Sequence, residues 1–320
     1  MLAYALIDYC QGVRIVQLSW IMRLRIVAAL AIGVLLIGVL AWPVVRQQTP
    51  FDPLSIAGGT VTAHAIITCG VMAFVAGLIA YFVCWPWGRE IGVIAAPAGL
   101  AIWAIRSGNM ANLMKQNHSI EQQQPLFRAL QLEPILWLAV VAAGFAGVFL
   151  AAKLRPGRPH AKQPENRNNK DRKYLNAVLA VVVSILIAQF CIGIFTQDRP
   201  VGDQKLGMVA AQPATGQIVF GVWISFGIAA FIVRKFLAAG YLWPTIASGI
   251  VTAFGIITYM KHDTMAYLVQ YWPPVFYSNA IISILPIQMV AFGTLGSIWG
   301  YWLAVRFIYW RQQGRQSDTA

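Results

Sequence analysis

The sequence predicts an all-α fold: a polytopic helical membrane protein with about eight transmembrane helices, arranged as two parallel four-helix repeats. Hydrophobic residues make up 58% of its 320 residues and charged residues only 11%, less than half of the roughly 25% that is usual in a soluble domain. The apolar residues form long uninterrupted segments, several of which reach the roughly 20 residues that a helix needs to cross a bilayer. The Lys and Arg residues are divided unequally between alternate loops, which is typical of membrane proteins with a fixed orientation.

Eight apolar segments are candidate spans, four in each half of the chain. They run over residues 26–45, 61–85, 91–105, 135–152, 175–195, 218–233, 241–260 and 279–305. The third is short, so it crosses the bilayer only if its flanks join in or neighbouring helices bury it. Residues 1–25 carry apolar side chains at helical spacing, which predicts an interfacial segment. No small-residue cleavage site follows the first apolar run, so we interpret it as a retained span, whether the chain starts at Met1 or at Met22.

The basic residues predict the orientation. With both termini in the cytoplasm, the inner segments carry 17 Lys and Arg and the outer loops carry 7, as the positive-inside rule requires. Eight of these cations lie in residues 153–174, a stretch rich in Pro and Asn that has the composition of a flexible linker. We therefore expect this stretch to be the main cytoplasmic loop of a protein of the plasma (inner) membrane. Membrane lipids are the expected partners of the net charge of +13, and no nucleic acid is expected, because aromatic residues do not interleave with the cations.

The two halves of the chain contain similar stretches. Residues 77–83 (GLIAYFV) resemble residues 227–233 (GIAAFIV) at a shift of 150 positions. Each half has an even number of predicted spans, so both keep one orientation and are related by an axis along the membrane normal. The predicted organisation is an N-terminal interfacial segment (1–25), a first four-helix unit (26–152), the basic linker (153–174), a second four-helix unit (175–310) and a tail (311–320).

The fourth span of each unit has small residues at a spacing of four. They are Ala143, Gly147, Gly296 and Gly300. Small residues let helix backbones approach closely in lipid, so these positions predict tight helix contacts, in self-association or with other membrane subunits. A generic Ala- and Gly-rich helix is the plainer interpretation. Amphipathic stretches over residues 107–134 and 262–279 precede these two spans, and we expect both to be helices on the outer surface.

No Asp, Glu, Lys or Arg lies within the eight predicted cores, and His64 opens the second. Such residues mark proton relays and coupled-ion sites, so a proton-coupled antiporter or a pump is disfavoured. A candidate outer vestibule consists of side chains near the outer ends of spans: His64, Arg106, Glu133, His262 and Asp263. The alternative is that these are ordinary interfacial residues at helix ends.

Uncharged groups within the spans form a second candidate site, a polar pathway. Its members are Pro97, Gln189, Ser248 and Gln288. Proline interrupts helical hydrogen bonding, while glutamine and serine offer hydrogen bonds at depth, which suits a neutral or amphiphilic solute. Kinks that improve packing would explain the same residues. The sequence predicts no catalytic residue, no metal site and no cofactor, because the four cysteines are scattered and no histidine pair faces across the spans.

These observations favour three functions, in a definite order. The first is a subunit or scaffold of a membrane assembly, which needs only helix-contact surfaces. The second is a facilitator-type transporter for a neutral or amphiphilic solute, which would use the polar pathway. The third is a lipid-modifying enzyme at the outer interface, which would use the vestibule residues. An enzyme is the least supported of the three.

Overall fold

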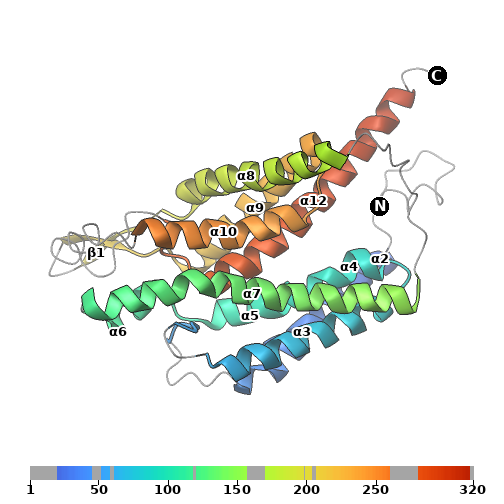
Figure 1. Ribbon diagram of the computed structural model, residues 1–320. Helices are drawn as coiled ribbons and strands as arrows, with labels where there is room; N and C mark the ends of the chain where they lie inside the picture. The colour runs from blue at the N-terminus through green and yellow to red at the C-terminus, as the bar shows by residue number, and fades with distance from the viewer. Residues whose placement is uncertain are drawn as a thin grey trace.

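The computed structural model describes most of the chain as a bundle of helices with one short β-hairpin (Figure 1). The described residues are 20–44, 52–57, 61–117, 120–156, 170–197, 199–203, 207–259 and 280–317.

Both halves of the chain consist of helices that begin or end near the expected boundaries. The first half contains α2 (Trp20–Gly33) with its π-helical continuation η1 (Val34–Leu40) and the 3-10 turn η2 (Trp42–Val44), then α3 (Ala63–Val83), α4 (Gly88–Ile91), the 3-10 turn η3 (Gly92–Ile94), α5 (Ala95–Arg106), α6 (Met110–Gln116) and α7 (Ile120–Leu154). The second half contains α8 (Lys170–Phe195), the strands β1 (Arg199–Asp203) and β2 (Gly207–Ala211), α9 (Thr215–Leu237), α10 (Leu242–Tyr259) and α12 (Pro286–Ser317).

In the described part of the chain, six helical stretches are long and apolar enough to cross a membrane, which fits the predicted class of helical, multi-pass membrane protein. They are Trp20–Val44, Ala63–Val83, Gly88–Arg106, Glu121–Leu154, Tyr174–Phe195 and Thr215–Leu237. The helix α10 is apolar over a shorter stretch, Leu242–Thr258. The helix α12 covers most of the eighth predicted span, residues 279–305, but it is not one of these six stretches.

The helix ends gather at two ends of the bundle. α2 begins and α12 ends at one of them, the terminal end, while α6 and the β-hairpin lie at the other, the hairpin end (Figure 1). In the hairpin, β1 pairs antiparallel with β2, and Val201 is opposite Val209. No strand was predicted in this loop, because a connection with scattered Gly, Pro and Ala lacks the alternating pattern of a half-buried strand.

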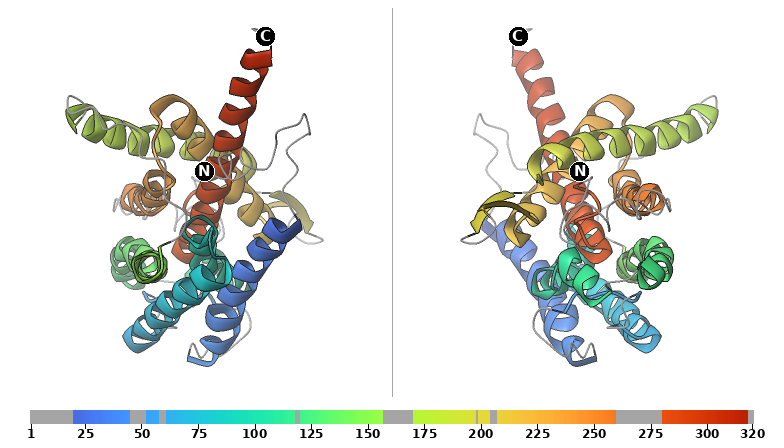
Figure 2. Two further views of the ribbon diagram at one scale, coloured as in Figure 1. Left: turned by 90° about the vertical axis from the view of Figure 1, so that its right-hand side faces the viewer. Right: turned by 90° about the vertical axis from the view of Figure 1, so that its left-hand side faces the viewer.

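The two halves of the chain pack against each other in a reciprocal way. Seen along the bundle, α2 and α3 lie on one side and α8 on the other, α12 runs outwards from the centre, and α7 and α10 lie side by side (Figure 2). Within each half the most extensive contact joins the second and fourth long helices, α3 with α7 and α9 with α12. Between the halves, α5 packs on α12 and α10 packs on α7. The third helix of each half thus contacts the fourth helix of the other.

The helix α7 continues through two prolines. It runs for 35 residues with Pro125 and Pro134 inside it, so the expectation that 107–134 forms a separate surface helix before a span at 135–152 is wrong for residues 120–134. At 1.5 Å per residue such a helix is roughly 50 Å long, more than the roughly 30 Å of the hydrocarbon core. A continuous buried stripe explains why the helix does not break: Phe127, Leu130, Glu133 and Trp137 are each at most 1% exposed and lie on one face across Pro134.

The third predicted span is longer and more deeply buried than the sequence alone indicated. Residues Gly88–Arg106 form one helical stretch of 19 residues, and 78% of the residues in its most apolar part are buried. Pro97 lies in the first turn of α5, just after the 3-10 turn η3. The proline has no N–H for the carbonyl of Val93, and such a loss is tolerated best in the first turn of a helix. In the 3-10 turn before it, the N–H of Ala95 donates to the carbonyl of Gly92.

Candidate functional site

The most elaborate polar site in the described part of the chain surrounds Glu133, near the hairpin end of α7. Glu133 is 1% exposed. The Ser55 hydroxyl donates to its Oε2 at 2.8 Å, and the indole Nε1 of Trp137, one helical turn later, donates to its Oε1 at 3.1 Å. The backbone N–H groups of Ile56 and Ala57 also donate to this carboxylate. Four donors therefore converge on one buried side chain, which satisfies the acceptor capacity of a carboxylate.

Three of these donors belong to the loop of residues 52–57, which is itself tied to the first half of the bundle. The N–H of Leu54 donates to the Ser107 hydroxyl at 2.9 Å, and the N–H of Gly108 donates to the carbonyl of Asp52 at 3.1 Å. The amide of Gln116, at the end of α6, donates to Oδ1 of Asp52 at 3.1 Å. Glu133 thus holds the loop onto α7, while Ser107 and Gln116 hold it onto α5 and α6.

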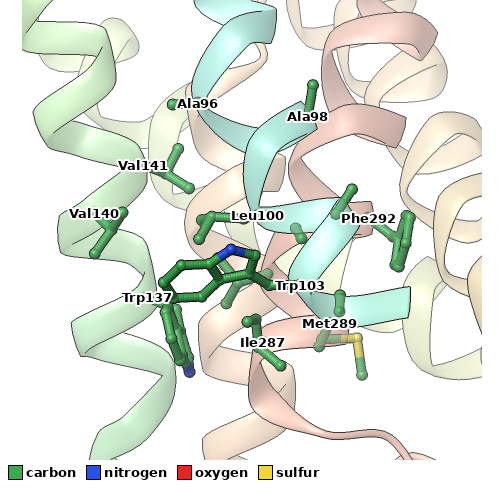
Figure 3. Close-up of a cluster of buried hydrophobic side chains, with 14 of the residues drawn as sticks. Ala96, Ala98, Leu100, Trp103, Trp137, Val140, Val141, Ile287, Met289 and Phe292 are labelled. Atoms are coloured by element: carbon green, nitrogen blue, oxygen red, sulfur yellow. The ribbon is translucent and has the colours of Figure 1, made fainter. Parts of the chain in front are cut away.

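A chain of tryptophans leads from Glu133 into the centre of the molecule. The rings of Trp137 and Trp103 are 6.4 Å apart in an edge-to-face arrangement, and Trp103 meets Trp42 in the same way at 6.0 Å. The Nε1 of Trp103 donates to the carbonyl of Ile37 at 2.8 Å. Ile37 lies in the π-helical η1, where the local i→i+5 hydrogen bonding departs from the regular helical pattern. Figure 3 shows Trp103 and Trp137 packed between α5, α7 and α12.

The structure places the predicted vestibule residues in different environments. Glu133 is buried, whereas His64 and Arg106 are exposed. The Arg106 guanidinium lies over the Trp42 ring, 5.1 Å from its centroid, so the tryptophan chain connects it indirectly to Glu133. His262 and Asp263 lie outside the described residues, as does the whole stretch 262–279. Among the described vestibule residues, only Arg106 and Glu133 are thus linked through side chains that the structure records.

The predicted pathway residues are spread over four helices, and three of them have structural roles. The amide oxygen of Gln288, in the first turn of α12, accepts from the N–H of Leu285 at 3.2 Å, while its amide nitrogen donates to the carbonyl of Ala104 at 3.3 Å. The first contact caps the start of α12, and the second joins α12 to α5. Ser248 donates to the carbonyl of Thr245 within α10, at 2.7 Å, and Pro97 lies at the 3-10 turn described above. Gln189 is half-buried on α8.

The predicted helix-contact residues lie largely at contacts within the chain. A Cβ atom added to Gly147 would collide with the carbonyl oxygen of Phe74 in α3, and one added to Gly296 or Gly300 would collide with the carbonyl oxygens of Trp223 or Gly227 in α9. Ala143 is half-buried on α7. The small residues thus permit close packing of α3 on α7 and of α9 on α12.

Sequence reasoning missed the partners that define the Glu133 site. Trp137 could have been found, since a residue four positions along a helix lies on the same face. Ser55 is 78 positions away from Glu133, and no local pattern joins them. In the described part of the chain, no group of three or more His, Cys, Asp or Glu side chains is arranged to hold a metal ion. Comparison of the chain with protein family models, curated proteins and solved structures gives no match.

Proposed function

We propose that this chain is a subunit or scaffold of a membrane assembly, docking with other membrane helices through the outward face of α8. The observation that carries the proposal is the side chain of Gln189. It is half-buried in α8, between Leu186 at 61% and Phe190 at 70% exposure, in a stretch long and apolar enough to cross the membrane. Its amide therefore lies beside the part of α8 that is turned away from the bundle. An unpaired amide facing hydrocarbon is unfavourable, and a neighbouring helix commonly satisfies it.

The packing between the two halves supports a structural role over a facilitator. Trp103, Trp137, Leu100, Ile287 and Met289 fill the space between α5, α7 and α12 and are fully buried (Figure 3). Gln288, the one pathway residue at this seam, has both ends of its amide bonded to backbone groups. A solute would have to displace these contacts to pass between the halves.

In the proposed topology the chain crosses the plasma (inner) membrane eight times, with both termini in the cytoplasm. Its two halves are proposed to derive from the duplication of a four-helix unit. The reciprocal packing of α5 on α12 and of α10 on α7 supports a pseudo-two-fold relation. The glycine contacts support it as well, because Gly147 on α7 approaches a backbone carbonyl of α3 as Gly300 on α12 approaches a backbone carbonyl of α9.

The experiment that tests the assembly is replacement of Gln189 by leucine. The protein is extracted from its native membrane in mild detergent, and the mass of the intact complex is measured by native mass spectrometry over a dilution series. We expect a complex heavier than one chain, and we expect Gln189→Leu to raise its dissociation constant about three- to twentyfold, because an interhelical hydrogen bond in lipid contributes roughly 0.6–1.7 kcal/mol.

Two control variants separate the amide from the surrounding apolar surface. Gln189→Asn retains an amide and should retain most of the assembly, whereas Leu186→Ala removes exposed apolar surface on the same helix and should have a smaller effect than Gln189→Leu. A wild-type protein that remains a single chain at every concentration contradicts the proposal, as does a Gln189→Leu variant that assembles with unchanged affinity.

A further inference from the structure

A second polar cluster lies at the opposite end of the bundle from Glu133, where the two halves of the chain meet. We call it the seam cluster and define it by Arg89 on α4, Arg234 in the last turn of α9, Tyr241 just before α10 and Tyr301 on α12. The rings of Tyr241 and Tyr301 are 5.5 Å apart, and Cζ of Arg234 lies 5.1 Å from the centroid of the Tyr301 ring. Arg89 and Glu90 are close enough to act electrostatically on the Tyr241 hydroxyl. Both halves of the chain therefore contribute an arginine to the same place.

Arg234 has a hydrogen-bonding group that the protein does not satisfy. Its Nη1 donates to the carbonyl of Ala238 at 3.0 Å. Its Nε is buried and has no acceptor in the part of the chain that the structure describes. Buried donors nearly always have a partner, and a guanidinium is a particularly strong donor towards the oxygens of a phosphate or carboxylate. The structure thus leaves part of the hydrogen-bonding capacity of the Arg234 guanidinium unused.

The charge of the cluster favours an anion. Arg89 and Arg234 supply two positive charges, and Glu90 is the neighbouring carboxylate. Both guanidinium groups lie over aromatic rings, Arg89 over Phe149 at 5.5 Å and Arg234 over Tyr301. Stacking on a ring holds the plane of a guanidinium in place while leaving its N–H edge free to donate. The two tyrosine hydroxyls are further donors at the same position.

The surroundings of the cluster are those of a lipid headgroup region. Arg234 lies in the last turn of one stretch able to cross the membrane, and Arg89 lies in the first turn of another. The same end of the bundle carries further cations stacked on aromatic rings, among them Arg155 on Trp85 and Arg306 on Trp310, each at 4.4 Å. Basic pockets between helices at this level of a membrane protein bind anionic headgroups.

We propose that the seam cluster binds the phosphate group of an anionic phospholipid, with Arg234 as the central donor and Arg89 as the second cation. The site requires both halves of the chain, so a bound lipid links α4 to α9, α10 and α12. This inference is independent of the assembly through α8, because Gln189 is not part of the cluster. A soluble phosphate could accept a hydrogen bond from Arg234 just as the phosphate of a lipid headgroup does. The experiment distinguishes these two ligands.

The test measures lipid binding to the full-length protein in detergent by native mass spectrometry. Phosphatidylglycerol is titrated in one arm, phosphatidylcholine in a second and inorganic phosphate in a third. We expect bound phosphatidylglycerol, little phosphatidylcholine, and an affinity for phosphatidylglycerol about tenfold lower in Arg234→Ala, since hydrogen bonds between charged groups are among the strongest in proteins. Binding of inorganic phosphate as tight as that of phosphatidylglycerol would overturn the lipid assignment.

Matched variants show whether the effect belongs to this cluster. Arg106→Ala removes an arginine that lies over an aromatic ring as Arg234 does, in this case Trp42 at the hairpin end, and it should leave phosphatidylglycerol binding unchanged. Equal losses in Arg106→Ala and Arg234→Ala contradict the site. If Arg234→Ala does not fold, Tyr301→Phe removes one hydroxyl only and should weaken binding severalfold, and unchanged binding in that variant contradicts the site. Gln189→Leu should bind phosphatidylglycerol normally, so failure of the assembly proposal and failure of this one are distinguishable.

Discussion

Replacing Glu133 by alanine is expected to lower the free energy of unfolding by about 3–5 kcal/mol, because several buried donors lose their acceptor at once. The Ser55 hydroxyl and the Trp137 indole would be left unpaired in a site that is 1% exposed. The N–H groups of Ile56 and Ala57 lose the same partner. Thermal unfolding in detergent, followed by tryptophan fluorescence, measures the change, and the loop of residues 52–57 should become susceptible to proteolysis before the rest of the protein unfolds.

A neighbouring glutamate provides the control for this prediction. Glu121 lies in the first turn of the same helix and is exposed, so Glu121→Ala should change stability by no more than about 0.5 kcal/mol. Glu133→Gln should give an intermediate loss, since an amide keeps one acceptor oxygen but turns an NH₂ group towards donors. If Glu133→Ala is as stable as Glu121→Ala, the carboxylate does not hold the loop.

Replacing Gly77 by alanine is expected to destabilise the protein by about 2–3 kcal/mol. The added methyl group would collide with the backbone carbonyl of Gly144 on α7, so α3 and α7 would have to separate along one of the most extensive helix contacts in the molecule. Backbone atoms cannot move aside as a flexible side chain can, and overpacking of this kind typically destabilises by 1–3 kcal/mol. The midpoint of thermal unfolding in detergent should fall accordingly.

The control lies on the same helix. A Cβ atom added to Gly70 meets no atom within 4 Å, so Gly70→Ala should be neutral or should stabilise α3 by up to about 1 kcal/mol through its helix propensity. Equal effects of the two substitutions would show that α3 and α7 do not approach as closely as the structure places them. In the second half, Gly300→Ala is the counterpart of this test, because its methyl group would collide with the carbonyl of Gly227.

The general architecture could be predicted from the sequence because burial in lipid leaves a strong, local signal. Each of the eight predicted spans contains helix in its described residues, since an apolar run of this length has no other way to satisfy its backbone in hydrocarbon. The extent of α7 could not be predicted, because proline normally marks a helix boundary. Only the tertiary contacts of Phe127, Leu130 and Trp137, all fully buried, explain why the helix continues past Pro134.

The candidate site was predicted less well than the fold, because its geometry depends on contacts between distant residues. The sequence grouped Glu133 with His64 and Arg106 by their predicted depth, but the structure buries the first and exposes the others. Gln288 was interpreted as a group lining a pathway, whereas its amide caps α12 and binds the carbonyl of Ala104, 184 positions away. The distinction between a lining residue and a cross-link requires knowledge of which helices are neighbours.

The reciprocal contacts of α5 with α12 and of α10 with α7 restrict how this protein can move. A rocking motion, in which one half turns as a rigid body against the other, would shear both contacts together and break the bond from Gln288 to Ala104. The four helices that make these contacts are therefore expected to move together as one rigid unit. Any large displacement would fall to the peripheral helices α2 and α8, which have fewer buried residues than the central helices.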